Sequence, residues 1–187
     1  DDDGVLDIAH LTSLLGPKTK LLAFTHVSNA LGTINPVTQL VALARDRGIT
    51  TLIDGAQAVP HQRVSVDEIG ADFYVFSGHK VVGPSGAGVL HGRMDLLEAM
   101  PPFLGGGDMI ESVSFEGTTF APVPHKFEAG TPDIASIIGF GAAIDYLETI
   151  GMDEIAAYEH ELLVYANERL ATVPGIRIIG QAKEKAA

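Results

Sequence analysis

Lys80 is the residue whose type and position point most directly to chemistry. It follows Ser77-Gly78-His79 immediately after an apolar segment, and Gly83 and Gly86 come soon after it. A lysine amine attacks a carbonyl group to form an imine only when it is deprotonated. Because a lysine side chain has a pKa of about 10.4 in water, an imine-forming site has to favour the neutral amine by burial or by a nearby cation. The alternative interpretation is a surface lysine in a glycine-rich turn.

Two more polar clusters occupy positions equivalent to that of Lys80. Each cluster follows a short apolar segment of the kind that forms strands buried on both faces. In open parallel sheets, ligands bind beyond the carboxyl ends of the strands. We therefore expect the clusters to meet at one edge of a sheet, with His26 in a structural role. The three clusters are Thr25-His26-Val27-Ser28-Asn29, Asp54-Gly55-Ala56-Gln57 and Ser77-Gly78-His79-Lys80.

An alternation of strand and helix patterns positions these clusters. Helical spacing of apolar residues after Pro36, ending at Gly48, indicates a helix between the first two strands. A strand–helix–strand order with apolar strands indicates an α/β fold with a mainly parallel sheet flanked by helices. The elements expected before residue 92 are a helix at 7–15 and strands at 21–24, 50–53, 73–76 and 88–90.

The chain after Gly92 differs in character. Proline and glycine clusters punctuate a loop-rich segment, and helical patterns follow at about 134–149 and 155–170. Residues 176–179 indicate a strand, and the polar tail 182–187 is expected to fray. We expect residues 1–150 to form part of a large ligand-binding domain and residues 151–187 to begin a smaller C-terminal domain.

The composition limits the classes of partner. Lys and Arg number 12 against 24 Asp and Glu, which gives a formal net charge of −12 and argues against nucleic acid or an anionic membrane as partner. No apolar run approaches the roughly 20 residues that cross a bilayer, and the N-terminus has no secretion-signal pattern. The lack of cysteine excludes disulfides and thiolate metal sites within the chain, and we expect no metal. A cytoplasmic location is compatible with these features.

The segment from Asp72 to Leu90 resembles the pyridoxal-phosphate (PLP) lysine signature of class V aminotransferases. The matching residues are Asp72-Phe73-Tyr74-Val75-Phe76-Ser77-Gly78-His79-Lys80 and Gly83-Pro84-Ser85-Gly86-Ala87-Gly88-Val89-Leu90. The resemblance implies a fold type I PLP-dependent transferase, with residues 1–150 in its cofactor-binding large domain. It also implies that Lys80 holds pyridoxal 5'-phosphate as a Schiff base and that Ser77 and His79 bind the phosphate. A capped turn is the alternative for the last two.

Asp54-Gly55-Ala56-Gln57 matches the family's Asp-x-x-Gln at the same place. By resemblance, Asp54 is the buried carboxylate that keeps the cofactor's ring nitrogen protonated, and Gln57 donates to its phenolic oxygen. Taken alone, Asp54 could instead cap a following helix. Asn29 lies in a segment that resembles the one reaching the cofactor and the substrate carboxylate, and its alternative is a turn residue with left-handed backbone.

Two loop motifs resemble those of group II cysteine desulfurases of the sulfur-mobilising type, including selenocysteine lyase-like enzymes. The motifs are Gly105-Gly106-Gly107-Asp108-Met109-Ile110 and Phe127-Glu128-Ala129-Gly130-Thr131-Pro132. The first usually has Glu where this chain has Asp108. The resemblance covers essentially the whole chain and implies a homodimer in which Thr131 reaches the partner's cofactor phosphate. Thr131 could instead cap the helix that follows it.

The implied reaction takes sulfur from L-cysteine and leaves L-alanine, passing the sulfur as an enzyme persulfide to an acceptor protein, for example for iron–sulfur clusters. In the family, the persulfide cysteine and the carboxylate-binding arginine come after a segment like this one, and the ring-stacking histidine comes before it. We therefore interpret the chain as the central part of such an enzyme, inactive by itself. Other class V enzymes (selenocysteine lyase, kynureninase-like or epimerase-like) and a non-enzymatic assembly piece stay open. A nucleotide-binding domain is disfavoured, because the glycines after Lys80 lack the order and context of G-x-G-x-x-G.

Overall fold

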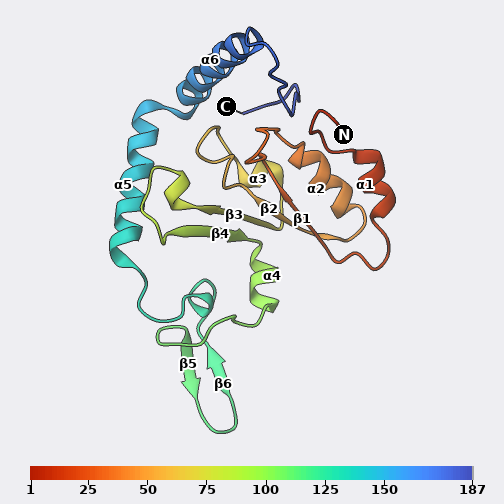
Figure 1. Ribbon diagram of the computed structural model, residues 1–187. Coiled ribbons are helices and arrows are strands. Elements are labelled where there is room, and N and C mark those ends of the chain that lie inside the picture. The colour runs from red at the N-terminus through yellow and green to blue at the C-terminus, as the bar shows by residue number, and fades with distance from the viewer. Residues whose placement is uncertain (187) are drawn as a thin grey trace.

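A four-stranded sheet forms the centre of the computed structural model, which describes residues 1–186 (Figure 1). Its order is β1-β2-β3-β4, and the strands are β1 (Leu21–Thr25), β2 (Thr50–Asp54), β3 (Phe73–Ser77) and β4 (Gly88–Gly92). β1, β2 and β3 run parallel and β4 is antiparallel to β3. The β3–β4 connection, residues 78–87, is too short for the crossover that a parallel strand needs. The prediction that the three apolar segments share one sheet is confirmed.

Helices α2 (Val37–Arg45) and α3 (Val66–Ile69) contribute to the hydrophobic core on one face of the sheet. α2 starts after Pro36, as the sequence predicted. It ends at Arg45, and the chain turns at Gly48, whose φ is +64°. Burial at helical spacing turns one stripe of α2 toward β2. The buried residues of this core are Val37, Val41, Ile53, Ile69, Ala71 and Tyr74.

Strand β1 is less buried than its apolar sequence predicted. Leu21, Ala23 and Thr25 are exposed, whereas Leu22 and Phe24 are half-buried. Successive side chains of a strand point to opposite faces, so one face of β1 packs on the core and the other faces solvent. The expectation of burial on both faces is therefore wrong for β1 within residues 1–186.

A second core joins α5 (Ile134–Ile150) to the segment after β3. Phe140 packs against Phe76 at a ring-centroid distance of 6.3 Å, and it belongs to the same cluster as Val81 and Ala87. α6 (Met152–Ala171) follows after a 74° bend at Gly151, whose φ is +95°. No single helix within residues 1–186 is long and apolar enough to cross a membrane, and α5 with α6 meets that length and composition only as a bent pair.

The segment after Gly92 contains more regular structure than the sequence predicted. It holds α4 (Met94–Ala99), the hairpin of β5 (Ile110–Val113) and β6 (Thr118–Phe120), and the 3-10 turn η2 (His125–Phe127). The hairpin projects away from the main sheet in Figure 1, and its strand residues are all exposed. The sequence therefore had no alternation of apolar and polar residues that would have indicated the hairpin.

The two ends of the chain depart from expectation in smaller ways. Helix α1 spans Ile8–Leu14, with Asp7 as its N-cap rather than its first residue. Residues 176–179 are irregular, so the predicted strand is wrong; Ile176 and Ile179 are exposed. The tail 182–186, which was expected to fray, pairs with the segment after β1 through an antiparallel bridge between Thr33 and Lys185, and Ala187 lies outside the described residues. The domain boundary at 150/151 coincides with the α5–α6 bend and stays a prediction.

Candidate active site

The strand register brings the three polar clusters to one edge of the sheet. Thr25 pairs with Asp54, and Asp54 pairs with Val75, so the carboxyl ends of β1 and β2 are level and β3 continues two residues further, to Ser77. Beyond the strands, the amide of His26 donates to the carbonyl of Asp54 at 2.8 Å. Because side chains alternate along a strand, Thr25, Asp54 and Ser77 lie on the same face of the sheet.

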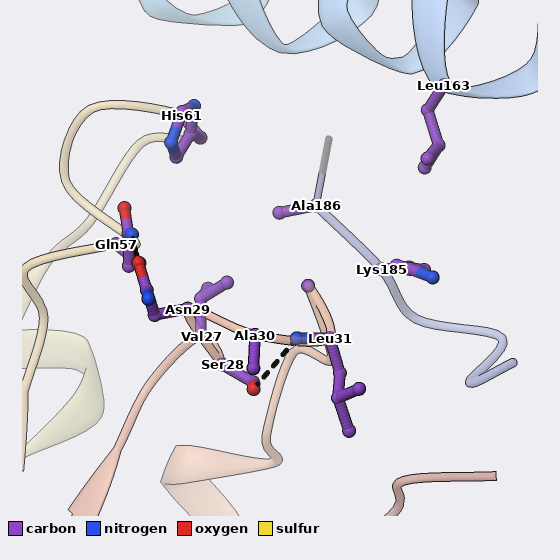
Figure 2. A pocket seen from close by; sticks show the side chains of 11 residues that line it. Val27, Ser28, Asn29, Ala30, Leu31, Gln57, His61, Leu163, Lys185 and Ala186 are labelled. Atoms are coloured by element: carbon purple, nitrogen blue, oxygen red, sulfur yellow. Dashed lines mark hydrogen bonds between the residues drawn. The ribbon is translucent and has the colours of Figure 1, made fainter. Parts of the chain in front are cut away.

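Asn29 and Gln57 meet beside this edge. The Gln57 Nε2 donates a hydrogen bond to Asn29 Oδ1, and Figure 2 shows the two amide groups end to end. Both line a cavity of about 280 Å³ that also contacts His61, Leu163 of α6 and Lys185 of the tail. Asn29 does not have the left-handed backbone of the turn alternative, since the non-glycine residues with positive φ among residues 1–186 are Val82 and Asp108.

Asp54 is exposed, which corrects the expectation of a buried carboxylate. Its Oδ1 accepts the amide of Ala56 at 2.9 Å, and its other carboxylate oxygen has no hydrogen-bond partner among the described residues. Residues 56–61 form turns rather than a helix, so the helix-cap alternative for Asp54 is also wrong. One carboxylate oxygen at the carboxyl edge of the sheet is thus available to a ligand.

Lys80 ends the 3-10 turn η1 (Gly78–Lys80) that follows β3 directly. Lys80 and Ser77 are half-buried and His79 is exposed, and within residues 1–186 their side chains make no hydrogen bond. The turn is fixed instead by main-chain bonds, including Gly83 N–H to the Gly78 carbonyl at 3.0 Å. The capped-turn alternative is wrong for Ser77, whose hydroxyl caps nothing.

Val82 is a feature of this turn that sequence reasoning missed. Its φ is +48°, in the left-handed region that β-branched residues avoid, and its side chain is exposed. Such a backbone conformation costs of order 1–3 kcal/mol and persists only when its surroundings impose it. Here the buried Val81 and the bond between Gly83 and Gly78 hold the two sides of Val82. The strain lies two residues from Lys80.

Three polar side chains contact one another below the Asp54–Gln57 turn. His26 Nδ1 lies 2.9 Å from the Tyr74 hydroxyl, and His26 Nε2 lies 3.3 Å from Nε2 of Gln62. Burial lowers the pKa of His26, and burial followed by the negative charge of Asp54 raises the pKa of Tyr74. Tyr74 and Gln62 were not predicted as site residues; a tyrosine within the apolar strand Phe73-Tyr74-Val75-Phe76 was the available signal.

The lowered pKa of His26 predicts acid sensitivity. The folded state holds His26 neutral, whereas the unfolded chain protonates it below pH about 6.5. The His26 contribution to stability is therefore fully present above pH 6.5 and is lost as the pH falls toward the lower, folded-state pKa. Each unit of difference between the two pKa values corresponds to about 1.4 kcal/mol.

The measurement is the melting temperature of the protein between pH 7.5 and 5, with variants His26→Asn and His10→Asn. His10 is exposed and lies outside the His26–Tyr74 contact, so its replacement should leave the pH dependence unchanged. His26→Asn keeps an N–H near Nδ1 and should flatten the loss of stability below pH 6.5. An identical slope in both variants would contradict the role given to His26.

The two loop motifs of the sequence lie against each other. The amide of Gly130 donates to the carbonyl of Gly107 at 2.9 Å, and Met109 next to this contact is fully buried. Asp108, where the family usually has Glu, has a φ of +66°, and aspartate tolerates this region better than most residues. Thr131 is exposed. The helix-cap alternative for Thr131 is wrong, because the side chain of Asp133 caps α5.

The donor set at this edge fits PLP. A carboxylate with a free oxygen suits a pyridinium N–H, an amide nitrogen suits a phenolate, and a hydroxyl with an imidazole suits a phosphate. A primary amine without a competing bond suits the cofactor's aldehyde. These groups belong to Asp54, Gln57, Ser77, His79 and Lys80, which lie at or just after the carboxyl ends of the neighbouring strands β2 and β3. Among residues 1–186, no cluster of His, Asp and Glu could hold a metal ion.

Comparison with known proteins decides the family. A family model described as "Aminotransferase class-V" matches residues 1–187. The chain belongs to the class V aminotransferase family. Class V enzymes of this group depend on PLP. The predicted resemblance is confirmed.

Several relatives and solved structures that are similar to the chain are cysteine desulfurases. A probable cysteine desulfurase of Xylella fastidiosa is 53% identical over 185 residues, which cover 99% of this chain and 44% of the relative. The structure of the cysteine desulfurase CsdA from Escherichia coli superposes with a TM-score of 0.91 at 38% identity, over 96% of this chain and 45% of that one. A structure of SspA in complex with cysteine has a TM-score of 0.64 at 26% identity, over 78% and 38%. The predicted α/β class is confirmed, and the chain spans less than half the length of these relatives.

Proposed function

We propose that the chain forms the cofactor-binding part of a PLP-dependent cysteine desulfurase. The observation that carries the proposal is the alignment of Asp54, Gln57 and the Ser77–Lys80 turn at one sheet edge, in a chain 53% identical to a probable desulfurase. PLP supplies an electron sink that weakens bonds at the substrate's Cα and Cβ. Every other contribution below is assigned to residues of this chain.

The chain's residues divide the work of binding and proton transfer. Lys80 would hold the cofactor through Nζ and would serve as base and acid for the Cα proton. Ser77 and His79 hold the phosphate, Gln57 donates to the phenolic oxygen, and Asp54 keeps the ring nitrogen protonated. Asn29, fixed by its bond to Gln57, reaches the substrate side of the cofactor.

The substrate proposal rests on the paired loop motifs. Selenocysteine lyase, kynureninase-like and epimerase-like enzymes would use the same Lys80 and Asp54, because the cofactor chemistry is shared. The contact between Gly107 and Gly130 joins the two motifs that resemble those of desulfurases, and the sequence relatives support the same choice. L-cysteine is thus the proposed substrate, and a sulfur-acceptor protein and a cytoplasmic location complete the proposal.

The decisive experiment uses the full-length protein, in which this chain is joined to the segments that its relatives carry beyond it. L-cysteine with a reducing thiol should give L-alanine and sulfide in equal amounts, because the Cβ–Sγ bond breaks once for each molecule of alanine. The chain of 187 residues alone should release neither, since it contains no cysteine to accept the sulfur. Release of alanine and sulfide by the pure 187-residue chain, or none by the full-length protein with PLP, would contradict the proposal.

We further propose a homodimer in which Thr131 serves the partner's cofactor phosphate. Thr131 is exposed, does not cap α5 and follows Gly130, whose φ of +81° allows a tight turn. Mixing Lys80→Ala subunits with Thr131→Ala subunits tests this arrangement. A mixed dimer holds one pocket with an intact Lys80 facing an intact Thr131, so its cofactor affinity should recover relative to the Thr131→Ala homodimer. Verified mixed dimers without recovery would exclude a shared site.

A further inference from the structure

Tyr74 and His26 form a hydrogen-bonded pair below the candidate site, on the face of the sheet opposite the Asp54 carboxylate. Tyr74 is fully buried and His26 is 6% exposed. Their rings meet edge to face, with centroids 6.1 Å apart and planes at 90°. The pair joins the segment after β1 to β3, across β2. None of the roles assigned to the cofactor-binding residues uses it.

The contact with Gln62 determines which nitrogen of the His26 ring carries the proton. An amide nitrogen can only donate, so Gln62 Nε2 donates to His26 Nε2. A neutral imidazole carries one proton, which therefore resides on Nδ1 and is donated to the Tyr74 hydroxyl at 2.9 Å. Removal of the hydroxyl would leave a buried N–H without a partner, which is the costly way to lose a hydrogen bond.

The tyrosine ring packs against the main chain of the Asp54–Gln57 turn. A Cβ added to Gly55 would lie 2.1 Å from the Tyr74 ring, so the ring contacts the main chain of the turn directly. The amide of Gly55 also donates to the carbonyl of Val75, the residue after Tyr74, at 2.8 Å. A shift of the ring would therefore move Gly55, and with it Asp54 on one side and Gln57 on the other.

The histidine holds the same turn from its other side. Its amide donates to the carbonyl of Asp54 at 2.8 Å, while its ring holds the Tyr74 hydroxyl. Asp54 is thus tied to His26 through the main chain and rests next to Gly55 on the Tyr74 ring. Its own carboxylate has one internal bond, to the amide of Ala56, so its direction depends on the turn that carries it.

We propose that His26 and Tyr74 are positioning residues, whose buried hydrogen bond fixes the direction of the Asp54 carboxylate toward the ring nitrogen of the cofactor. This inference rests on the proposed function and adds two residues to its site. The pair touches neither cofactor nor substrate. Its main effect on turnover passes through Asp54, and that dependence makes it testable.

The experiment compares Tyr74→Phe with Thr51→Val in the full-length protein. Thr51 is an equally buried hydroxyl at the opposite end of β2, where it bonds to Asp72, so Thr51→Val matches the general cost of losing a buried hydroxyl. Tyr74→Phe should lower kcat by about tenfold through misplacement of Asp54, with PLP affinity changed by less than about threefold. In an Asp54→Ala background, Tyr74→Phe should change kcat by less than about twofold. His26→Asn should retain more activity than His26→Leu, because asparagine keeps an N–H for Tyr74.

A second readout uses the protein without cofactor. Hydrogen exchange at the amides of residues 55–59 should accelerate in Tyr74→Phe and stay unchanged in Thr51→Val. Equal effects of the two variants on kcat and on exchange, or an undiminished effect of Tyr74→Phe in the Asp54→Ala background, would overturn the positioning role. A wild-type protein that takes up no PLP would overturn the proposed function instead, and the exchange comparison would still decide whether the pair holds the turn.

Discussion

Replacement of Lys80 by alanine in the full-length protein should abolish covalent attachment of PLP. Lys80 Nζ has no hydrogen-bond partner among residues 1–186 and projects from a turn at the carboxyl end of β3. We therefore assign to it both the bond to the cofactor and the movement of the Cα proton. Turnover should fall by about 10²–10⁴-fold, the range expected when a positioned acid–base group is lost.

Absorbance and mass spectrometry check this result. A lysine-bound PLP absorbs visible light and becomes a stable amine on reduction with borohydride, so the reduced wild-type protein should carry the cofactor on the peptide containing Lys80. Lys18 is the matched control, because it is an exposed lysine outside the candidate site, and Lys18→Ala should keep the yellow colour and the labelled peptide. A borohydride-stable adduct in Lys80→Ala would assign the cofactor to another lysine.

The position of the site residues at one edge of the sheet was predictable, because a parallel sheet brings the carboxyl ends of its strands to the same edge. Apolar runs before Thr25, Asp54 and Ser77 predicted strands, and a parallel register then leaves little freedom in where those ends lie. The antiparallel β4 follows from the short 78–87 connection. The local pattern therefore contained the information that positions Asp54 and Lys80 at one edge.

Burial was not predictable to the same degree. The apolar β1 is exposed on one face and Asp54 is exposed, because burial depends on which elements cover a face, and a strand's own sequence does not encode that. The hairpin β5–β6 was missed for a related reason. All of its strand residues are exposed, so no alternation of apolar and polar residues indicated these strands in the sequence.

The positioning pair illustrates a further limit of sequence reasoning. His26 and Tyr74 are 48 residues apart, and their hydrogen bond depends on the exact crossing of the chain over β2. The requirement for glycine at position 55 is likewise invisible until the Tyr74 ring is in place beneath it. Asp133 caps α5 and Thr131 does not, and this could be predicted only if the first residue of the helix was known.

Loss of the Asp54 carboxylate should impair turnover far more than cofactor binding. Asp54→Ala removes the charge that keeps the ring nitrogen protonated, and loss of one preorganised electrostatic contact typically lowers kcat by about 10²–10³-fold. The phosphate contacts of Ser77 and His79 and the bond to Lys80 are untouched, so the dissociation constant of PLP should rise by only about tenfold, the effect of one charged hydrogen bond. The field of Asp54 already reaches Tyr74, whose pKa it helps to raise.

Asp54→Asn separates charge from shape in the same experiment. Asparagine can still accept the Ala56 amide, which Asp54 Oδ1 accepts at 2.9 Å, so the turn should keep its geometry. It offers the ring nitrogen a neutral partner, so kcat should fall nearly as far as in Asp54→Ala while PLP affinity stays close to that of the wild type. Asp46→Asn, at an exposed aspartate just after α2, should leave both quantities unchanged. The ring-nitrogen resonance of ¹⁵N-labelled PLP reports protonation directly: a protonated nitrogen in Asp54→Asn, or turnover within about threefold of wild type, would reduce Asp54 to a turn residue.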